Sequence, residues 1–166
     1  MKRNLGLVGC GHWSNKIIEE LNCHNKFLLK SIVCRNISRI NKKYKLKSYT
    51  NILDMINNES LDCLYIATNP RHNVEVFNLV KKLNIATIFE KPLSNNYEDA
   101  IKIYEYAKKN KKVYLTNLPN LYSDTYEQIS KFIKNNIYNI KRIIFIEGDN
   151  GPNRTNIHPV LDWGIH

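Results

Sequence analysis

Residues 5–14, with the sequence LGLVGCGHWS, predict how the chain folds. The apolar residues 5–8 are typical of a buried strand, and a helix is expected to begin near Ser14, with that side chain as its N-cap. Gly9 and Gly11 stand between them, and this order of strand, glycine turn and helix is typical of dinucleotide binding. Gly9 would allow the tight turn, while Gly11 would let the backbone approach a pyrophosphate beside the free N–H groups of the helix. Because Ser14 stands where a third glycine is usual, an ordinary strand-to-helix turn is the alternative.

The composition suits one globular domain or slightly more. Of the 166 residues, 43% are hydrophobic, and no apolar run is long enough to span a bilayer. The basic N-terminus is not followed by the unbroken apolar stretch of a signal peptide, so we expect a cytoplasmic protein. The formal net charge of +10 would suit a nucleic-acid surface. We favour solvated lysines at the ends of helices and strands, and expect neither a nucleic-acid nor a membrane partner.

The cysteines are expected to be reduced core residues. Cys10, Cys23, Cys34 and Cys63 form no C-x-x-C pair, and three of them fall in or beside expected strands. This pattern argues against both a disulfide framework and a zinc site, so no metal site is predicted.

Apolar runs alternate with helical patterns as far as residue 116. The expected strands are residues 4–9, 27–34, 61–67, 85–89 and 112–116, with a possible short strand at 47–49. This alternation predicts an α/β fold with a doubly wound parallel sheet. Right-handed crossovers place the carboxyl ends of all strands at one edge, where ligands bind. The segments expected to gather there are the glycine turn, Arg35, residues 68–70, residues 90–92 and Asn117.

The end of the second strand indicates which dinucleotide would be preferred. An acidic residue at this place binds the ribose 2′-hydroxyl of NAD, but here Cys34 and Arg35 occupy it, with Ser38 and Arg39 close behind. An arginine favours a 2′-phosphate by charge and by paired hydrogen bonds, so we lean towards NADP. The alternative is a solvent-facing arginine that stacks on adenine and discriminates little.

Two further places carry candidate catalytic groups. Lys91 follows the fifth strand and precedes Pro92, which restrains the lysine backbone at the ligand edge. A lysine held there can assist proton transfer from a hydroxyl; a surface lysine is the alternative. Asp162 and His166 lie four residues apart, and on a helix both would share one face, as a proton-accepting pair or as an ordinary surface ion pair.

Four motifs together resemble the Gfo/Idh/MocA oxidoreductases, the relatives of glucose–fructose oxidoreductase and inositol dehydrogenase. They are Gly9-x-Gly11-x-Trp13, residues 67–72 (ATNPRH), residues 90–93 (EKPL) and Asp162-x-x-x-His166. The resemblance implies a Rossmann domain over residues 1–118. It also implies that residues 119–166 are the incomplete beginning of a C-terminal substrate and oligomerisation domain, because family members are roughly twice as long.

The resemblance also implies a site. Lys91, Asp162 and His166 would be the catalytic residues, with His166 as the acid or base. The residues implied to bind the cofactor are Gly9, Gly11, His12, Trp13, Ser14, Arg35, Thr68, Asn69, Pro70, His72, Glu90, Lys91 and Asn117.

The implied activity is NAD(P)-dependent hydride transfer to or from a sugar, sugar-nucleotide or cyclitol by a homo-oligomeric enzyme. Trp13 followed by Asn15 is similar to the branch that acts on nucleotide-linked sugars. The alternative is a catalytically inactive NAD(P)-binding fragment or sensor module.

Overall fold

The computed structural model describes residues 1–36, 38, 44 and 46–144. The chain divides into two compact units, Met1–Asn117 and Leu118–His166. Among the described residues, no helix combines the length and the apolar character needed to cross a bilayer.

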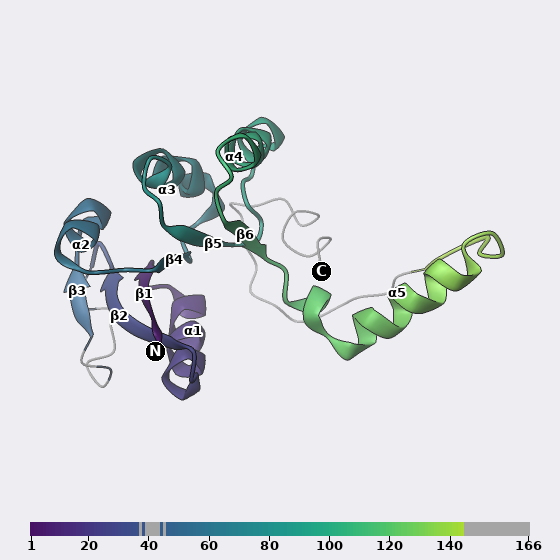
Figure 1. Cartoon of the computed structure of the whole chain (residues 1–166), viewed down its shortest axis with the longest axis horizontal. Helices are drawn as coiled ribbons and strands as arrows, with labels where there is room; N and C mark the ends of the chain where they lie inside the picture. Colours follow the sequence, from purple (N-terminus) through teal and green to yellow (C-terminus); the bar gives the residue numbers. More distant parts are fainter. Residues whose placement is uncertain (37, 39–43, 45, 145–166) are drawn as a thin grey trace. The chain divides into compact units, whose positions relative to one another are not determined.

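The first unit alternates strands and helices as the sequence predicts (Figure 1). Its strands are β1 (Arg3–Val8), β2 (Phe27–Val33), β3 (Lys47–Tyr49), β4 (Cys63–Ile66), β5 (Ala86–Glu90) and β6 (Tyr114–Asn117). Its helices are α1 (His12–Cys23), α2 (Ile52–Asn58), the 3-10 turn η3 (Pro70–His72), α3 (Asn73–Val80) and α4 (Tyr97–Lys109).

The six strands form one parallel sheet in the order β3-β2-β1-β4-β5-β6. This order confirms the predicted doubly wound α/β fold. β1 lies at the centre, and Leu5, Leu7 and Val8 are almost completely buried, because helices cover both faces of a parallel sheet. Val8 pairs with Val33 on one side and with Ile66 on the other, so β1, β2 and β4 end level with one another.

Two hydrophobic clusters fill the two faces of the sheet. On one face Ile17 and Ile18 of α1 pack against Leu5 and Leu7. The other face is covered by α2, α3 and α4 (Figure 1). These helices contribute apolar residues such as Met55, Phe77 and Ile103. The chain leaves β1 in one direction to β2 and β3 and then returns past it to β4, β5 and β6. The point where the strand order reverses therefore lies between β1 and β4, and crevices for ligands form there in such sheets.

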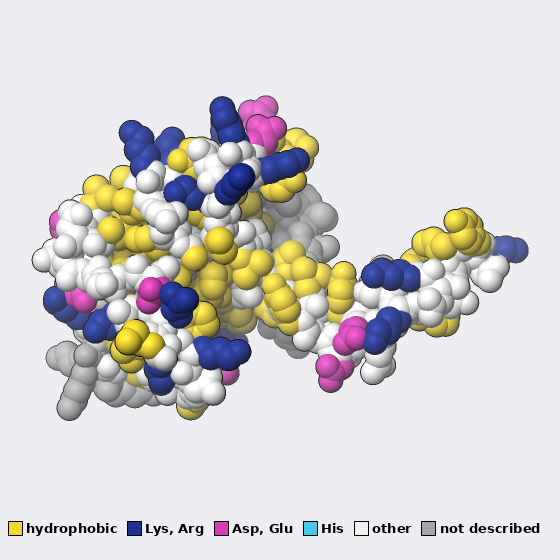
Figure 2. All heavy atoms as spheres, in the orientation of Figure 1, with side chains coloured by type: hydrophobic (Ala, Val, Ile, Leu, Met, Phe, Trp, Pro, Cys, Tyr) yellow, Lys and Arg dark blue, Asp and Glu magenta, His cyan; other side chains and the backbone are white. Residues whose placement is uncertain are grey.

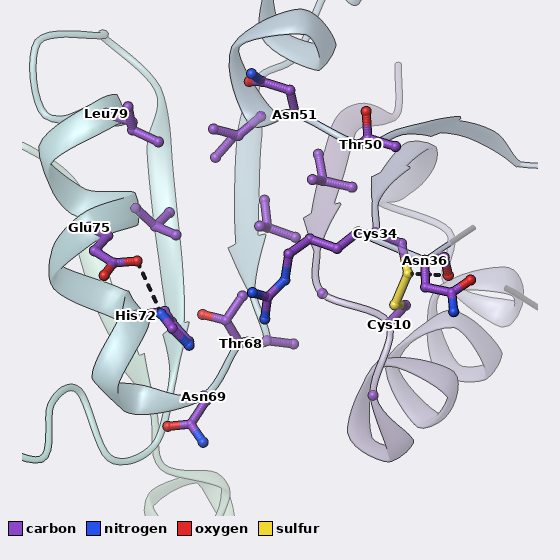
Figure 3. A pocket seen from close by; sticks show the side chains of 18 residues that line it. Cys10, Cys34, Asn36, Thr50, Asn51, Thr68, Asn69, His72, Glu75 and Leu79 are labelled. Atoms are coloured by element: carbon purple, nitrogen blue, oxygen red, sulfur yellow. Dashed lines mark hydrogen bonds and ion pairs between the residues drawn. A yellow bond between two sulfur atoms is a disulfide. The ribbon is translucent and has the colours of Figure 1, made fainter. Parts of the chain in front are cut away.

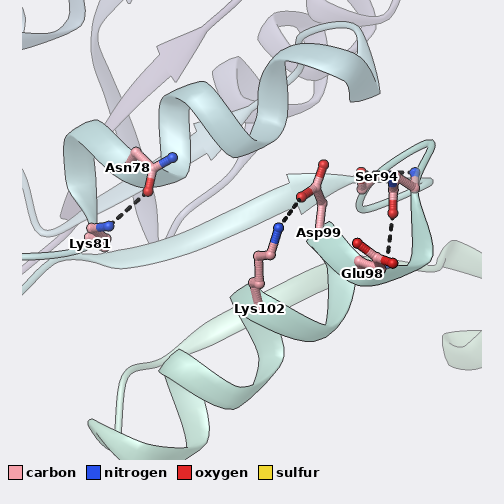
Figure 4. A network of polar contacts seen from close by, with 7 residues as sticks. Asn78, Lys81, Ser94, Glu98, Asp99 and Lys102 are labelled. Atoms are coloured by element: carbon pink, nitrogen blue, oxygen red, sulfur yellow. Dashed lines mark hydrogen bonds and ion pairs between the residues drawn. The ribbon is translucent and has the colours of Figure 1, made fainter.

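Asparagine side chains are the N-caps of two of these helices. Asn51 Oδ1 accepts a hydrogen bond from Leu53 N at 2.7 Å at the start of α2, and Asn96 Oδ1 accepts one from Glu98 N at 2.8 Å at the start of α4. Each cap satisfies a backbone donor that the helix itself leaves unpaired. Outer helix faces carry pairs within one turn, such as Lys102 with Asp99 (Figure 4).

The start of α1 differs from the expectation. Ser14 is not the N-cap: the helix begins at His12, Gly11 is the cap residue, and no side chain caps it. Ser14 instead lies inside the first turn and is completely buried. Its Oγ lies 3.5 Å from the position that a Cβ on Gly9 would take, so a serine fits the close packing usually made by the third glycine.

The second unit contains the 3-10 turn η4 (Pro119–Tyr122) and α5 (Asp124–Asn136), whose N-cap Ser123 accepts a hydrogen bond from Tyr126 N at 3.1 Å. On the face shown in Figure 2, lysine and arginine side chains are scattered over the helices, with acidic side chains beside several of them.

Candidate functional site

A cavity of about 750 Å³ opens at the carboxyl ends of β1, β2 and β4, at the point where the strand order reverses. The sequence-predicted cofactor residues that line it are Gly9, Gly11, Arg35, Thr68, Asn69 and His72. Four segments that are distant in the sequence therefore meet at one cavity, because parallel strands bring their carboxyl ends to one edge.

Gly9 is required by the backbone at the floor of this cavity. Its φ is +118°, and a Cβ at this residue would lie 2.4 Å from Ala67 O at the end of β4. Gly9 N also donates a hydrogen bond to Val33 O at 2.9 Å, so the residue is held between β2 and β4. Only glycine combines this φ with such a close approach.

Gly11 has a different role. Its φ of −80° and ψ of −175° are open to any residue, and a Cβ there would meet no atom within 4 Å. The absent side chain leaves free space beside the first turn of α1. The uncapped N–H groups of that turn are available to an anion, so this part of the cavity fits a pyrophosphate.

Cys10 and Cys34 correct the prediction that the cysteines are unpaired. They form a disulfide, with their Cα atoms 5.5 Å apart, on the side of the cavity opposite α3 (Figure 3). They meet because Val8 and Val33 pair in register, so the residues just after β1 and β2 are neighbours. Cys34 Sγ also lies 2.9 Å from Asn36 O, which is a close contact and not a hydrogen bond, because a disulfide sulfur carries no hydrogen. Cys63 is buried as predicted, whereas Cys23 is exposed.

The end of β2 presents polar and cationic groups to the cavity. Arg35 and Asn36 line it, and both residues are exposed. Asn36 Oδ1 accepts hydrogen bonds from Ser38 N at 3.1 Å and from Ser38 Oγ at 2.6 Å, which tightens the turn after the strand. No acidic residue belongs to the described part of the cavity wall that follows β2.

The opposite wall is formed by the end of β4 and by α3. Asn69 caps η3 through a hydrogen bond of 3.2 Å from Arg71 N, and His72 Nδ1 lies 3.0 Å from Glu75 Oε2 (Figure 3). Thr68 Oγ1 donates to Asn73 Oδ1 at 2.9 Å, and Asn73 Nδ2 donates to Leu93 O at 3.0 Å. The fully buried Asn73 thus ties this wall to the loop that carries Lys91.

A second polar group of side chains lies at the ends of β4, β5 and β6, and we name Tyr65, Glu90 and Asn117 the Glu90 cluster. Tyr65 Oη donates to Glu90 Oε1, and Asn117 Nδ2 donates at 2.8 Å to both Tyr65 Oη and Glu90 Oε1. Lys91 N donates to Glu90 Oε2 at 3.3 Å, and the Lys91–Pro92 peptide bond is cis. Burial and the Glu90 carboxylate raise the pKa of Tyr65, so its hydroxyl keeps its proton.

The structure therefore places the predicted site residues in three groups. Six line the cavity, as stated above. His12, Trp13, Ser14, Pro70, Glu90, Lys91 and Asn117 lie at the same edge of the sheet or at the start of α1 but outside the cavity lining. Asp162 and His166 lie outside the described residues.

Some residues at this edge were not predicted. Asn36, Thr50, Asn51 and Glu75 line the cavity, and Tyr65 joins the Glu90 cluster. Thr50 and Asn51 follow the short strand β3, so the same rule about strand ends could have found them. Tyr65 differs from its apolar neighbours in β4 only by its hydroxyl, and this pattern alone indicates no role.

Strand order, crossover point and cavity together define a Rossmann-type fold. Residues 3–118 match the oxidoreductase family with an NAD-binding Rossmann fold, GFO_IDH_MocA. The chain therefore belongs to the Gfo/Idh/MocA oxidoreductase family. No curated protein matches the sequence.

Several solved structures share the fold. Myo-inositol 2-dehydrogenase from Lactobacillus plantarum has a TM-score of 0.74 at 17% identity, over 84% of this chain and 43% of that chain. The WlbA dehydrogenase from Chromobacterium violaceum, in complex with NADH and UDP-GlcNAcA, has a TM-score of 0.76 at 18% identity, over 83% of this chain and 41% of that chain. A variant of KijD10, a 3-ketoreductase from Actinomadura kijaniata in complex with TDP-benzene and NADP, has a TM-score of 0.72 at 13% identity, over 82% and 45%. This chain thus spans less than half the length of each of them.

Proposed function

We propose that this chain is the NAD(P)-binding part of a dehydrogenase that acts on a sugar, sugar-nucleotide or cyclitol. Hydride would move between the nicotinamide and a hydroxyl or carbonyl carbon of the substrate. The observation that carries the proposal is the cavity at the carboxyl ends of β1 and β4. Gly9 and Gly11 line it, and the space beside Gly11 is free. Membership of an NAD-binding oxidoreductase family supports it, as do similar structures named for an inositol dehydrogenase and a ketoreductase.

The residues of the cavity fit a dinucleotide. The space beside Gly11 and the uncapped start of α1 would hold the pyrophosphate. The adenosine half would then lie towards the end of β2, where Arg35 is exposed. The nicotinamide half would lie over the ends of β4 and β5, which lead to Glu90 and Lys91.

The proposed preference of this site for NADP over NAD rests on Arg35. A guanidinium beside a 2′-phosphate makes charge-assisted hydrogen bonds worth about 1.5–3 kcal/mol, or roughly 10- to 100-fold in affinity. Arg35→Ala should therefore weaken NADPH binding by that factor and change NADH binding little. Equal losses for the two cofactors would instead indicate an arginine that stacks on adenine.

The chain's own residues would handle the proton. Nicotinamide supplies or accepts the hydride when bound. Lys91 and Asp162 would hold the reacting hydroxyl and its neighbour, and His166 would take the proton from the reacting hydroxyl or return it.

Titration of NADPH and NADH into the protein, followed by turnover assays with sugars, sugar nucleotides and cyclitols, tests the proposal. Binding with turnover is expected. Binding without turnover of any substrate would favour the alternative, a catalytically inactive NAD(P)-binding module. The absence of any shift in melting temperature with either cofactor would contradict both. The cytoplasmic location and the homo-oligomeric state stay predictions.

A further inference from the structure

The Glu90 cluster is built around a hydroxyl to which neither the sequence motifs nor the cavity assigns a role. Tyr65 comes from the middle of the sheet, is half-buried, and its Oη forms hydrogen bonds with two neighbouring side chains. It donates its proton to Glu90 Oε1 and accepts a hydrogen bond from Asn117 Nδ2 at 2.8 Å. One hydroxyl therefore links the ends of β4, β5 and β6.

Glu90 depends on this hydroxyl for its position. The residue is only 8% exposed, so its carboxylate has few water partners and needs hydrogen bonds from the protein. Tyr65 and Asn117 both donate to Oε1, while Lys91 N donates to Oε2 at 3.3 Å. Tyr65 and Asn117 thus fix one oxygen of the carboxylate, and the other oxygen accepts the hydrogen bond from the backbone N–H of Lys91.

We propose that Tyr65 is a positioning residue: through Glu90, it sets the backbone of Lys91 and the polar groups that meet the nicotinamide half of the cofactor. This inference rests on the proposed function, because it needs a dinucleotide to lie across the sheet edge from Arg35 towards β5. Tyr65 itself acts through its neighbours and lies outside the cavity lining. Its effect should therefore be confined to the half of the ligand that lies beyond the pyrophosphate.

Tyr65→Phe isolates the hydroxyl, because the ring and its packing are kept. Tyr106→Phe is the matched control, because Tyr106 is also half-buried and its Oη donates to Lys81 O at 2.7 Å. This contact joins α4 to the end of α3, on the face of the sheet opposite to the one on which Tyr65 packs. Tyr65→Phe loses the hydrogen bonds to Glu90 and Asn117, and Tyr106→Phe loses the one to Lys81 O, so both variants should melt at a lower temperature than the wild type.

Binding of NADH, NADPH and ADP separates positioning from stability. ADP carries only the adenosine half and the pyrophosphate, so its affinity reports on the glycine turn and the end of β2. We expect Tyr65→Phe to weaken the better-bound of NADH and NADPH about tenfold, or ~1.4 kcal/mol, with ADP binding unchanged. Tyr106→Phe should change none of the three affinities.

A double-mutant cycle with Glu90→Gln tests the route through Glu90. Glu90→Gln alone should cause the same selective loss, and Tyr65→Phe in that background should add little to it. This second variant also keeps the inference testable if Tyr65→Phe folds poorly. Fully additive losses would show that Tyr65 does not act through Glu90 and would overturn the inference.

The outcomes distinguish the two levels of the proposal. If the wild-type chain binds neither dinucleotide, the proposed function fails, and this inference fails with it. If the wild type binds but Tyr65→Phe binds NADH, NADPH and ADP as the wild type does, only the role of Tyr65 is overturned. An equal loss for ADP and the dinucleotides would assign Tyr65 a merely structural role.

Discussion

Replacing Gly9 by alanine is expected to destabilise the fold far more than the same change at Gly11, two residues away. Gly9 has a φ of +118°, whereas Gly11 has an ordinary extended backbone. An alanine Cβ at Gly9 would lie 2.4 Å from Ala67 O and 2.9 Å from Ala67 C, and both are backbone atoms of the adjacent chain segment. At Gly11 no atom lies within 4 Å of the added Cβ.

The cost at Gly9 has two parts. A non-glycine residue in this backbone region is strained by about 1–3 kcal/mol. Moving the backbone to relieve the overlap costs about 1–3 kcal/mol more, as overpacking typically does. Ala67 has little freedom to move, because Ala67 N donates to Val8 O at 2.8 Å in the β1–β4 ladder. Gly9→Ala should therefore lower the free energy of unfolding by about 4 kcal/mol, a large part of the roughly 5–15 kcal/mol that keeps a domain folded.

Thermal and urea unfolding, followed by circular dichroism, measure this difference. For a unit of this size, ~4 kcal/mol corresponds to a fall in melting temperature of roughly 10–20 °C. Gly11→Ala should cost less than about 1 kcal/mol, the range for replacing a glycine N-cap by alanine. Its effect should appear in binding, because the methyl group would occupy the space proposed for the pyrophosphate, and NAD(P)H affinity should fall about tenfold or more.

Two results would refute this reasoning. A Gly9→Ala variant that melts within about 2 °C of the wild type would show that the turn relaxes without cost, since even 1 kcal/mol shifts the midpoint by roughly that much or more. A Gly11→Ala variant that keeps full cofactor affinity would show that no phosphate approaches this backbone.

Three further predictions concern the cysteines and the Lys47–Glu59 ion pair. In the non-reduced native protein, a thiol reagent should modify exposed Cys23 quickly and buried Cys63 slowly. Burial raises the pKa of the Cys63 thiol to about 11, which leaves little of the reactive thiolate. Fast modification of Cys10 and Cys34 would contradict their pairing. Reduction of the Cys10–Cys34 disulfide, which spans 24 residues, should lower the free energy of unfolding by about 3 kcal/mol in urea titrations. Lys47 first and Tyr49 second hold the pKa of Glu59 below its ordinary 4.5, so this contact stabilises the fold above about that pH and its contribution is lost as the pH falls further. Glu59→Gln should therefore flatten the acid side of the curve of melting temperature against pH, and an unchanged curve would exclude the contact.

The sequence by itself determined the order of strands and helices, the parallel doubly wound sheet and the edge at which ligands would bind. These features follow from local patterns: apolar runs for buried strands, helical periodicity between them, and glycine, proline and asparagine at the ends. Residues predicted from their place after a strand, such as Arg35 and Thr68, consequently line the cavity. The family resemblance rested on short motifs of the same kind, and the match over residues 3–118 confirms it.

Only the tertiary structure decided which side chains meet. Tyr65 and Asn117 are 52 residues apart, and their contact depends on the strand order β4-β5-β6 and its register, which no local pattern specifies. The disulfide has the same origin, since Cys10 and Cys34 come together because β1 and β2 end level. Ser14 was expected to cap the helix but is buried inside its first turn, because the position of α1 against the sheet decides its surroundings. Local chemistry thus predicts where a site can form, while non-local strand pairing determines which groups form it.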